Sequence, residues 1–326
     1  MHGAWLESGQ VRFRTDLPAL VSTPAERRVE VLFAGVCATD LALLDGYMGF
    51  AGVPGHEFVG RLVDGPGAGT LVTGEINAAC GVCPTCLGQE RPLNGGPLDG
   101  RHCGARSVLG ILGRQGAMAA ELQLPSANLR PVPAGVSPEQ ATFAEPLAAA
   151  FEVLEQLGDV RGRRALVAGD GRLGLLIAQV LREAGCSVDL AGHHPERTPK
   201  GITGRCGLLD EPATPALAER YDLAVEATGR PDVLQRLFAW VRPRGTLVLK
   251  TTSAARARLD LSPVVVDELT LVGSRCGPFE PALAALASGA VQVDSMIHAT
   301  LPLAEVDKAF ALAARPGVLK VLIDCR

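Results

Sequence analysis

The pattern of apolar and polar positions changes along the chain. From Met1 to about Pro133, short apolar runs such as RRVEVLFAGV and EFVGRLVDGPGAG are broken by Gly, Pro and Asp, which is typical of β-strands joined by turns. At Ser137 a long Ala- and Leu-rich stretch begins, SPEQATFAEPLAAAFEVLEQL, with a serine N-cap and a proline at the first helical position. The pattern therefore predicts a β-rich domain followed by a region that opens with a helix.

Strand and helix patterns then alternate. The expected strands are RALVAGDG (164–171), CSVDLAGHH (186–194), DLAVEAT (222–228) and TLVLKTT (246–252). The expected helices are RLGLLIAQVLREAG (172–185), TPALAERY (214–221) and DVLQRLFAWVRPRG (232–245). Such alternation predicts a parallel sheet covered on both faces. The pattern changes again near residue 290, and the segment 302–326 predicts one more helix and strand.

Composition narrows the class of protein. With 326 residues, of which 47% are hydrophobic, the chain can form two domains with separate cores. A net charge of −4 indicates no general attraction to nucleic acid or to anionic lipid. The N-terminus lacks a signal-peptide pattern and no apolar run reaches the length of a membrane span, so we expect a cytoplasmic protein with no membrane partner. Nine cysteines then favour metal binding or thiolate chemistry over disulfides.

A glycine-rich loop follows the first strand of the alternating region. Gly169, Gly171 and Gly174 have the GxGxxG spacing, and Arg172 and Leu173 lie between the last two. The strand before the loop and the helix after it are the context in which this pattern binds the pyrophosphate of a dinucleotide. A purely structural turn is the alternative reading.

The end of the next strand bears on the choice between NAD and NADP. An acid there would bind the ribose 2′-hydroxyl of NAD, but the strand ends in Gly192, His193 and His194, with Arg197 nearby. Asp189 lies several residues before the strand end. The pattern slightly favours the 2′-phosphate of NADP, although the histidines could equally be solvated turn residues.

Candidate metal ligands lie in the first region. GVCATD contains Cys37 and Thr39, and GHEFVG contains His56 and Glu57. A thiolate, an imidazole and a carboxylate are ligands that zinc prefers. A further acid, Glu145, lies in the apolar segment FAEPLAAA, where a cation or a donor would offset the cost of burying it. Taken singly, each of these residues could be an ordinary core or capping residue.

A cysteine cluster, Cys80, Cys83, Cys86 and Cys103, offers four thiolates for one metal. Four sulfur ligands form a closed tetrahedral zinc site, which stabilises the fold and has no open position for catalysis. An iron–sulfur centre, a redox-active CxxC pair, or no metal are the competing interpretations, and the proline expected after the last cysteine of one iron–sulfur motif is absent.

Several motifs in order give the chain a family resemblance. GVCATD, GHEFVG, the cysteine cluster, FAEPLAAA, AGDGRLG, VEATGRPD, VRPRGTLVL and AFALAARPGVLKVLI resemble the zinc-dependent medium-chain dehydrogenase/reductase (alcohol dehydrogenase) family, in particular its polyol and threonine dehydrogenase-like branch. The resemblance implies an α/β protein with a GroES-like β-rich catalytic domain at 1–147, completed by 291–326. It also implies a Rossmann domain with a doubly wound parallel sheet at 148–290.

The resemblance also implies roles for residues. Cys37 and His56 become ligands of a catalytic zinc, with Glu57 or Glu145 as the acidic ligand. Thr39 becomes the hydroxyl that relays the substrate proton, and Asp40 the acid that orients the site.

The other two sites follow from the same resemblance. The coenzyme, NAD or NADP, would contact the glycine loop, His193, His194, Arg197, Thr228 and Arg275. The family spacing places the fourth structural cysteine at Asn94, so Cys103 is expected to replace it after an insertion within ERPLNGGPLDG.

The function implied is hydride transfer between NAD(P) and a secondary alcohol, polyol or hydroxy amino acid, by a homodimer or homotetramer. Two alternatives remain. A zinc-independent enoyl or quinone reductase on the same scaffold would not need Cys37, His56 and Glu145. A nucleotide-binding protein that has lost its chemistry would not need the intact set either.

Overall fold

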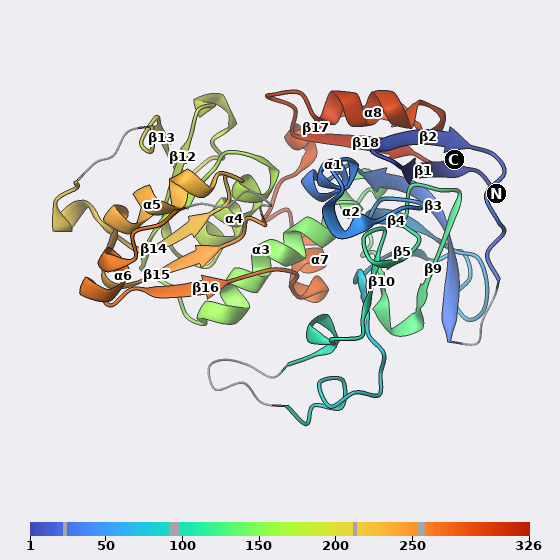
Figure 1. Cartoon of the computed structure of the whole chain (residues 1–326), viewed down its shortest axis with the longest axis horizontal. Helices are drawn as coiled ribbons and strands as arrows, with labels where there is room; N and C mark the ends of the chain where they lie inside the picture. Colours follow the sequence, from blue (N-terminus) through green and yellow to red (C-terminus); the bar gives the residue numbers. More distant parts are fainter. Residues whose placement is uncertain (22–24, 91–97, 211–213, 253–257) are drawn as a thin grey trace. The chain divides into compact units, whose positions relative to one another are not determined.

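The chain forms two units in the computed structural model, which describes residues 1–21, 25–90, 98–210, 214–252 and 258–326 (Figure 1). The first unit comprises Met1–Glu145 and Phe279–Arg326, and the second comprises Pro146–Pro278. The sequence placed the first boundary after residue 147 and the second after residue 290. The structure therefore moves helix α7 (Phe279–Ser288) from the second unit into the first.

Helix α7 belongs to the first unit because of what it contacts there. It packs against α2 (Pro138–Ala141), and Glu280 at its start forms an ion pair with Arg130, with 2.7 Å between Oε1 and Nε. The sequence pattern changes only near residue 290, so the expected boundary fell after α7.

The first unit is built on a seven-stranded sheet. Its strands follow the order β10-β5-β4-β3-β18-β17, and β9 pairs with β3 off this path. The members are β3 (Glu26–Gly35), β4 (Glu57–Leu62), β5 (Leu71–Gly74), β9 (Glu121–Pro125), β10 (Leu129–Pro131), β17 (Ile297–Pro302) and β18 (Lys320–Asp324). The predicted C-terminal strand thus becomes β18, which pairs antiparallel with β3.

Smaller elements surround this sheet. The strands are the hairpin β1 (Gly3–Glu7) and β2 (Gln10–Arg14), and the small sheet β6 (Asn77–Ala78), β7 (Ser107–Leu109) and β8 (Gly113–Arg114). The further helices are α1 (Ala38–Leu44) and α8 (Val306–Ala313). Short 3-10 turns occur at η1 (Tyr47–Gly49), η2 (Gly100–His102), η3 (Ser126–Asn128), η6 (Asp294–Met296) and η7 (Leu303–Glu305).

The second unit is a parallel sheet of six strands in the order β13-β12-β11-β14-β15-β16. The strands are β11 (Arg164–Ala168), β12 (Ser187–Gly192), β13 (Thr203–Cys206), β14 (Tyr221–Glu226), β15 (Val241–Leu249) and β16 (Thr270–Gly273). This is the Rossmann order, in which the chain reverses direction across the sheet between β11 and β14. Strands β13 and β16 were not predicted.

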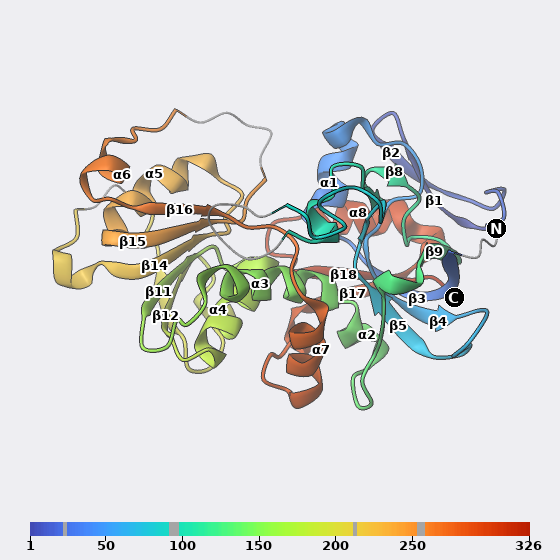
Figure 2. The same ribbon diagram turned by 90° about the horizontal axis from the view of Figure 1, so that it is seen from below.

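Helices cover both faces of this sheet. Figure 2 shows α4 (Arg172–Glu183) on one face, and α5 (Pro231–Trp240) with α6 (Ser262–Val266) on the other. Helix α3 (Ala144–Leu157) leads into the unit, and short 3-10 turns occur at η4 (Pro195–Arg197) and η5 (Leu217–Glu219). The helix predicted at 214–221 is only the turn η5. Helix α5 ends at Trp240, before the predicted 245, because Val241 already belongs to β15.

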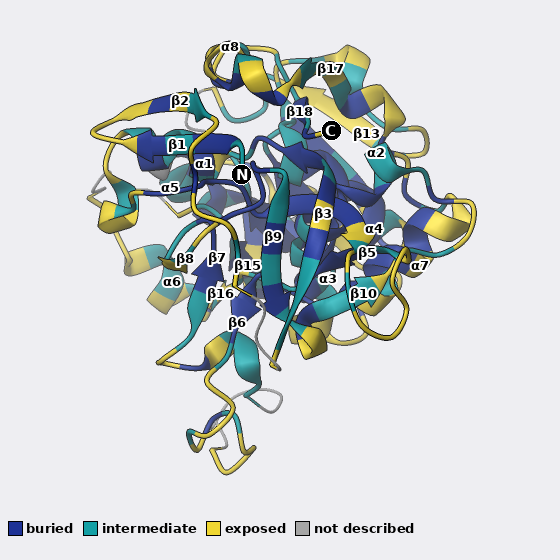
Figure 3. Cartoon of the chain, turned by 90° about the vertical axis from the view of Figure 1, so that its right-hand side faces the viewer, coloured by how far each residue is buried: buried dark blue, intermediate teal, exposed yellow. Residues whose placement is uncertain are grey.

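The sequence explains the burial of the central strands. In β11 every residue except Arg164 is buried, and β14 is buried apart from Asp222, as expected where helices cover both faces of a sheet. One core cluster joins Leu166, Tyr221 and Phe238 across β11, β14 and α5. The strands β1, β3 and β9 also carry buried residues, in dark blue in Figure 3. Among the described residues, no helix is long and apolar enough to cross a membrane.

Candidate active site and metal centres

Strand pairing brings Cys37 and His56 together. Gly35, the last residue of β3, lies opposite Glu57, the first residue of β4. Cys37 follows β3 as the N-cap of α1, and His56 immediately precedes β4. The ligand atoms of Cys37, His56 and Glu57 all lie within 4.8 Å of one another, and only 3% of His56 and 1% of Glu57 are exposed. A half-buried thiol, a buried imidazole and a buried carboxylate thus lie together.

Asp40 contacts the residues of this group through both of its carboxylate oxygens. Its Oδ2 accepts a hydrogen bond of 2.8 Å from the backbone N–H of Cys37, and its Oδ1 accepts one of 3.2 Å from the N–H of Gly55. The same Oδ1 lies 3.4 Å from Nδ1 of His56. Asp40 is completely buried, and its carboxylate lies beside Nδ1 of His56, in the position from which acids orient metal-binding histidines.

The surroundings of His56 favour a positive charge. Burial opposes protonation of the imidazole, but the carboxylate of Asp40 and the thiol of Cys37 raise its pKa well above the ordinary value. Nδ1 of His56 is buried and forms no hydrogen bond within the part of the chain that the structure describes. A cation bound beside Cys37 would meet the same negative surroundings, so the donor set fits zinc.

Glu57 also pairs with Lys320, a residue that the sequence patterns did not single out. Its Oε2 accepts a hydrogen bond from Nζ of Lys320, the first residue of β18, and each side chain is 1% exposed. Nζ of Lys320 also lies 5.6 Å from the ring centroid of Phe143. A lysine buried in an apolar strand needs such a partner, and the lysine in VLKVLI was the available signal.

Glu145 lies near this group but outside it. It is the second residue of α3 and is not one of the three residues whose ligand atoms lie within 4.8 Å. Burial raises the pKa of Glu145 to about 7; the charges of His56 and Lys320 act against this rise, and that of Glu57 adds to it. The charges of His56, Glu57 and Lys320 therefore influence the pKa of Glu145, although its carboxylate lies outside the group.

Thr39 lies beside the thiol. Its Oγ1 is 4.0 Å from Sγ of Cys37, in the first turn of α1. The hydroxyl that the sequence assigned to proton relay is thus adjacent to the candidate ligands.

The four clustered cysteines meet in space. Sγ of Cys83 lies 3.4 Å from that of Cys86 and 3.7 Å from that of Cys103, and Sγ of Cys80 lies 3.6 Å from that of Cys103 and 3.9 Å from that of Cys86. Four sulfurs around zinc at about 2.3 Å are separated by about 3.8 Å. The four thiols therefore have the dimensions of a tetrahedral zinc site, and the spacing before Cys103 does not prevent closure.

The lobe that carries these thiols is largely exposed. Figure 3 shows the loop beyond β6 mostly in the colours of exposed and intermediate residues. Backbone N–H groups of Val82 and Cys83 lower the pKa of Cys80 to about 6, whereas burial and the neighbouring thiol of Cys83 raise that of Cys86 to about 12. Residues 91–97, which include Asn94 and most of the expected insertion, lie outside the described residues.

The glycine loop has the backbone of a pyrophosphate site. Gly169 follows β11 with a φ of +112°, and a Cβ on Gly174 would lie 1.8 Å from the carbonyl oxygen of Gly169. Gly171 caps α4 and has open space around its Cα, and Arg172 and Leu173 form the first turn of the helix. The backbone N–H groups at a helix start can bind phosphate oxygens.

Comparisons with known proteins agree with this architecture. The alcohol dehydrogenase GroES-like domain matches residues 23–134, and an NAD(P)-binding family matches residues 157–259. The chain is 28% identical to an L-threonine 3-dehydrogenase of Streptomyces coelicolor, over 99% of this chain and 96% of that one. It is 26% identical to a 2-dehydro-3-deoxy-L-galactonate 5-dehydrogenase of Pseudoalteromonas atlantica, over 94% of both. The solved alcohol dehydrogenase TADH of Thermus sp. ATN1 superposes with a TM-score of 0.86 at 28% identity, covering all of both chains.

The chain carries the two domains of the medium-chain dehydrogenases/reductases, an alcohol dehydrogenase GroES-like domain and an NAD(P)-binding domain. It is therefore an oxidoreductase with an NAD(P)-binding domain.

In this dehydrogenase the carboxylate of Asp189 is bound by residues of neighbouring strands. Its Oδ2 accepts a hydrogen bond of 2.6 Å from the hydroxyl of Tyr221, and Nε of Arg205 lies 3.8 Å from the same oxygen. The group lies between β12, β13 and β14, so Asp189 stabilises the sheet.

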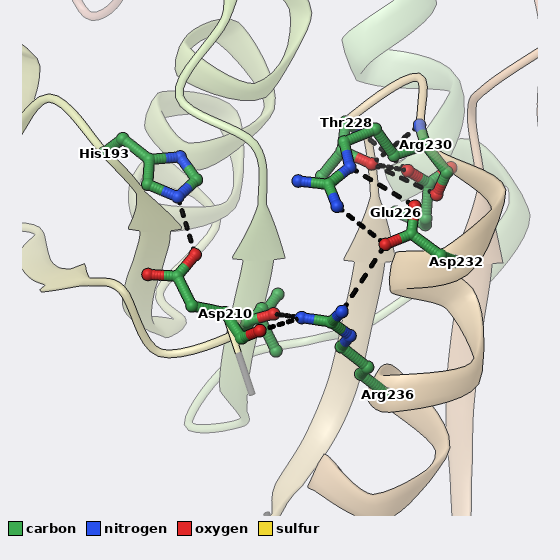
Figure 4. Close-up of polar contacts among 8 residues, drawn as sticks. His193, Asp210, Glu226, Thr228, Arg230, Asp232 and Arg236 are labelled. Atoms are coloured by element: carbon green, nitrogen blue, oxygen red, sulfur yellow. Dashed lines mark hydrogen bonds and ion pairs between the residues drawn. The ribbon is translucent and has the colours of Figure 1, made fainter. Parts of the chain in front are cut away.

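The two histidines after β12 each face an acid. Nε2 of His193 lies 2.7 Å from Oδ1 of Asp210, as Figure 4 shows, and Nδ1 of His194 lies 3.3 Å from Oε1 of Glu196. These side chains are exposed or nearly so. The cations expected for a 2′-phosphate are thus already partnered.

The remaining coenzyme candidates of the dehydrogenase, Thr228, Arg275 and Arg197, follow β14, β16 and β12 respectively. The hydroxyl of Thr228 donates a hydrogen bond of 2.6 Å to Oε1 of Glu226 (Figure 4). The carbonyl of Arg275 accepts one of 2.8 Å from Nζ of Lys250. Arg197 lies in η4, with Nε 3.9 Å from Oε1 of Glu196. The structure places all three within the second unit.

Proposed function

We propose that this dehydrogenase uses zinc to oxidise the secondary hydroxyl of a small polyol, sugar acid or hydroxy amino acid, with NAD(P)⁺ as hydride acceptor. The main support for this proposal is that the ligand atoms of Cys37, His56 and Glu57 lie close together and next to Asp40. The names of the relatives support the substrate class, because they act on threonine and on a sugar acid.

Each residue of the proposed active site has its own role. Cys37 and His56 would hold the metal, together with the carboxylate of Glu57 or Glu145. A bound zinc supplies Lewis acidity, which lowers the pKa of an alcohol toward neutrality. Thr39 Oγ1, which lies 4.0 Å from Sγ of Cys37, would accept the hydroxyl proton of the substrate while its own proton passes toward solvent. Asp40 keeps the imidazole of His56 oriented throughout.

A second zinc in the cysteine lobe would have a different role. The sulfur-to-sulfur distances of 3.4–3.9 Å match a closed tetrahedral site. Such a metal stabilises the lobe and takes no part in catalysis.

Removal of the metal tests the proposal. We expect the protein to reduce NAD⁺ or NADP⁺ with at least one member of a panel containing L-threonine, sorbitol and L-idonate. Complete chelation should lower this rate at least about 100-fold, and added Zn²⁺ should restore it. A rate that survives complete loss of zinc would contradict the proposal and favour the zinc-independent reductase. The readout is the absorbance of the reduced coenzyme, with zinc measured on the same samples.

A homodimer formed through the second unit is part of the proposal. Strand β16 is the edge of the parallel sheet, and Leu271 within it is 39% exposed. On α6, Val265 and Val266 are 77% and 79% exposed. An apolar sheet edge of this kind favours pairing with a second copy, which would extend the sheet and cover these side chains.

A charge at this edge should separate the subunits. We expect Leu271→Asp combined with Val266→Asp to convert a dimer or tetramer into a smaller species, because each carboxylate would be buried without a partner. Val21→Asp is the control, since Val21 is equally apolar and 77% exposed but belongs to the first unit. Sedimentation velocity measures the mass. A wild-type monomer, or a double variant of unchanged mass, would contradict this interface.

A further inference from the structure

The end of β12 lacks the acid that usually binds the adenosine ribose of NAD. The strand ends at Gly192, and His193 and His194 follow. Asp189, the only acid within the strand, accepts the hydrogen bond from Tyr221 and is therefore engaged inside the sheet. A ribose bound at this edge would need its hydrogen-bond acceptor from another element.

Asp170 of the glycine loop supplies a carboxylate at this position. Its Oδ2 accepts hydrogen bonds of 2.8 Å from the backbone N–H of His193 and 2.6 Å from that of His194. A Cβ on Gly192 would lie 2.2 Å from Cγ of Asp170 and 2.4 Å from Oδ2. The carboxylate of Asp170 therefore occupies the space that a side chain at position 192 would need.

Strand register explains how the loop reaches this far. Strands β11 and β12 are parallel neighbours, with Ala168 opposite Ala191, and the N–H of Gly169 donates a hydrogen bond of 2.8 Å to the carbonyl of Ala191. Asp170 is two residues beyond the end of β11. Its carboxylate thus extends from the glycine loop to the end of β12, where the adenosine ribose lies in this fold.

The charges around Asp170 disfavour a phosphate. Its Oδ1 makes no hydrogen bond with any part of the chain that the structure describes. Asp210 faces His193, and its backbone carbonyl oxygen accepts a hydrogen bond from Arg236. Arg236 also forms an ion pair of 3.6 Å with Asp232 (Figure 4). The carboxylate of Asp170 would repel a dianionic 2′-phosphate at this position, and the imidazoles of His193 and His194 already face Asp210 and Glu196.

We propose that Asp170 replaces the missing strand-end acid, accepts a hydrogen bond from the ribose 2′-hydroxyl, and makes this dehydrogenase selective for NAD(H) over NADP(H). A carboxylate is a strong acceptor for a hydroxyl, and it repels a phosphate at the same position. The inference rests on the proposed function, since it requires that the second unit bind a nicotinamide coenzyme. It replaces the slight preference for NADP that the strand-end sequence suggested.

The test compares binding of NADH and NADPH by isothermal titration calorimetry, in wild-type protein, Asp170→Asn and Asp189→Asn. Asparagine at 170 keeps one oxygen for the two backbone N–H groups but presents an amide that cannot accept from the ribose. We expect wild-type protein to bind NADH at least about tenfold more tightly than NADPH, and Asp170→Asn to reduce the ratio of the two Kd values to about threefold or less. Asp189→Asn is the matched control, and it should leave the ratio unchanged.

The possible outcomes distinguish a failure of the role proposed for Asp170 from a failure of the proposed function. Wild-type protein that binds NADPH as tightly as NADH, or an Asp170→Asn variant with an unchanged ratio, would overturn the role of Asp170 while leaving the dehydrogenase function intact. Failure to bind either coenzyme would overturn both. The same titrations with adenosine 5′-monophosphate and adenosine 2′,5′-bisphosphate should show the same change in preference, because these fragments contain the ribose but no nicotinamide.

Discussion

Cys37→Ala is expected to lower alcohol oxidation at least about 1000-fold while leaving the melting temperature nearly unchanged. The thiol belongs to the buried group formed with His56 and Glu57, and its loss removes a metal ligand without opening the core. Zinc analysis should fall from two ions per chain to one. The rate with the best alcohol of the panel, measured alongside zinc content and thermal unfolding, checks all three statements.

Two further cysteine variants complete this test. Cys103→Ala should lose the other zinc and lower the stability, because its sulfur closes the tetrahedron with Cys80 and Cys83. Cys186→Ala is the control: its buried thiol contacts the carbonyl of Val160, away from both metal groups, and its rate should match that of wild type. If Cys103→Ala were inactive yet fully stable with one zinc bound, the assignment of the two sites would be reversed.

Lys320→Met is expected to destabilise the first unit by about 3–5 kcal/mol, because it removes the ammonium group that pairs with the buried carboxylate of Glu57. This corresponds to a fall in Tm of roughly 10 °C. The matched control is Lys308→Met on α8, whose pair with Glu305 at 3.0 Å is exposed and should contribute less than about 1 kcal/mol.

A double variant isolates the pair. Replacing both members, as Glu57→Met with Lys320→Met, removes the unpaired charge and should recover at least half of the stability lost in Lys320→Met. Thermal unfolding of the four proteins gives the coupling free energy. If the double variant were as unstable as the sum of the two single variants, Lys320 would act through packing against Phe143 and not through Glu57.

Local patterns predicted much of the fold. The strand and helix alternation, the serine-capped start of α2 and the glycine loop all depend on residues close in sequence, so periodicity and spacing were sufficient. The predictions failed where tertiary contacts decided. Helix α5 ends earlier than predicted, because β15 begins at Val241. Helix α7 belongs to the first unit, where Glu280 forms an ion pair with Arg130.

The sequence by itself determined which residue types are available for each site: the Cys37, His56 and Glu57 donors, the four clustered thiols and the glycines of the coenzyme loop. Tertiary structure alone decided their partners. Lys320 reaches Glu57 across 263 positions because β18 pairs with β3, and Asp170 meets Gly192 because β11 and β12 are in register. Such contacts depend on strand order and register, which short-range patterns do not encode.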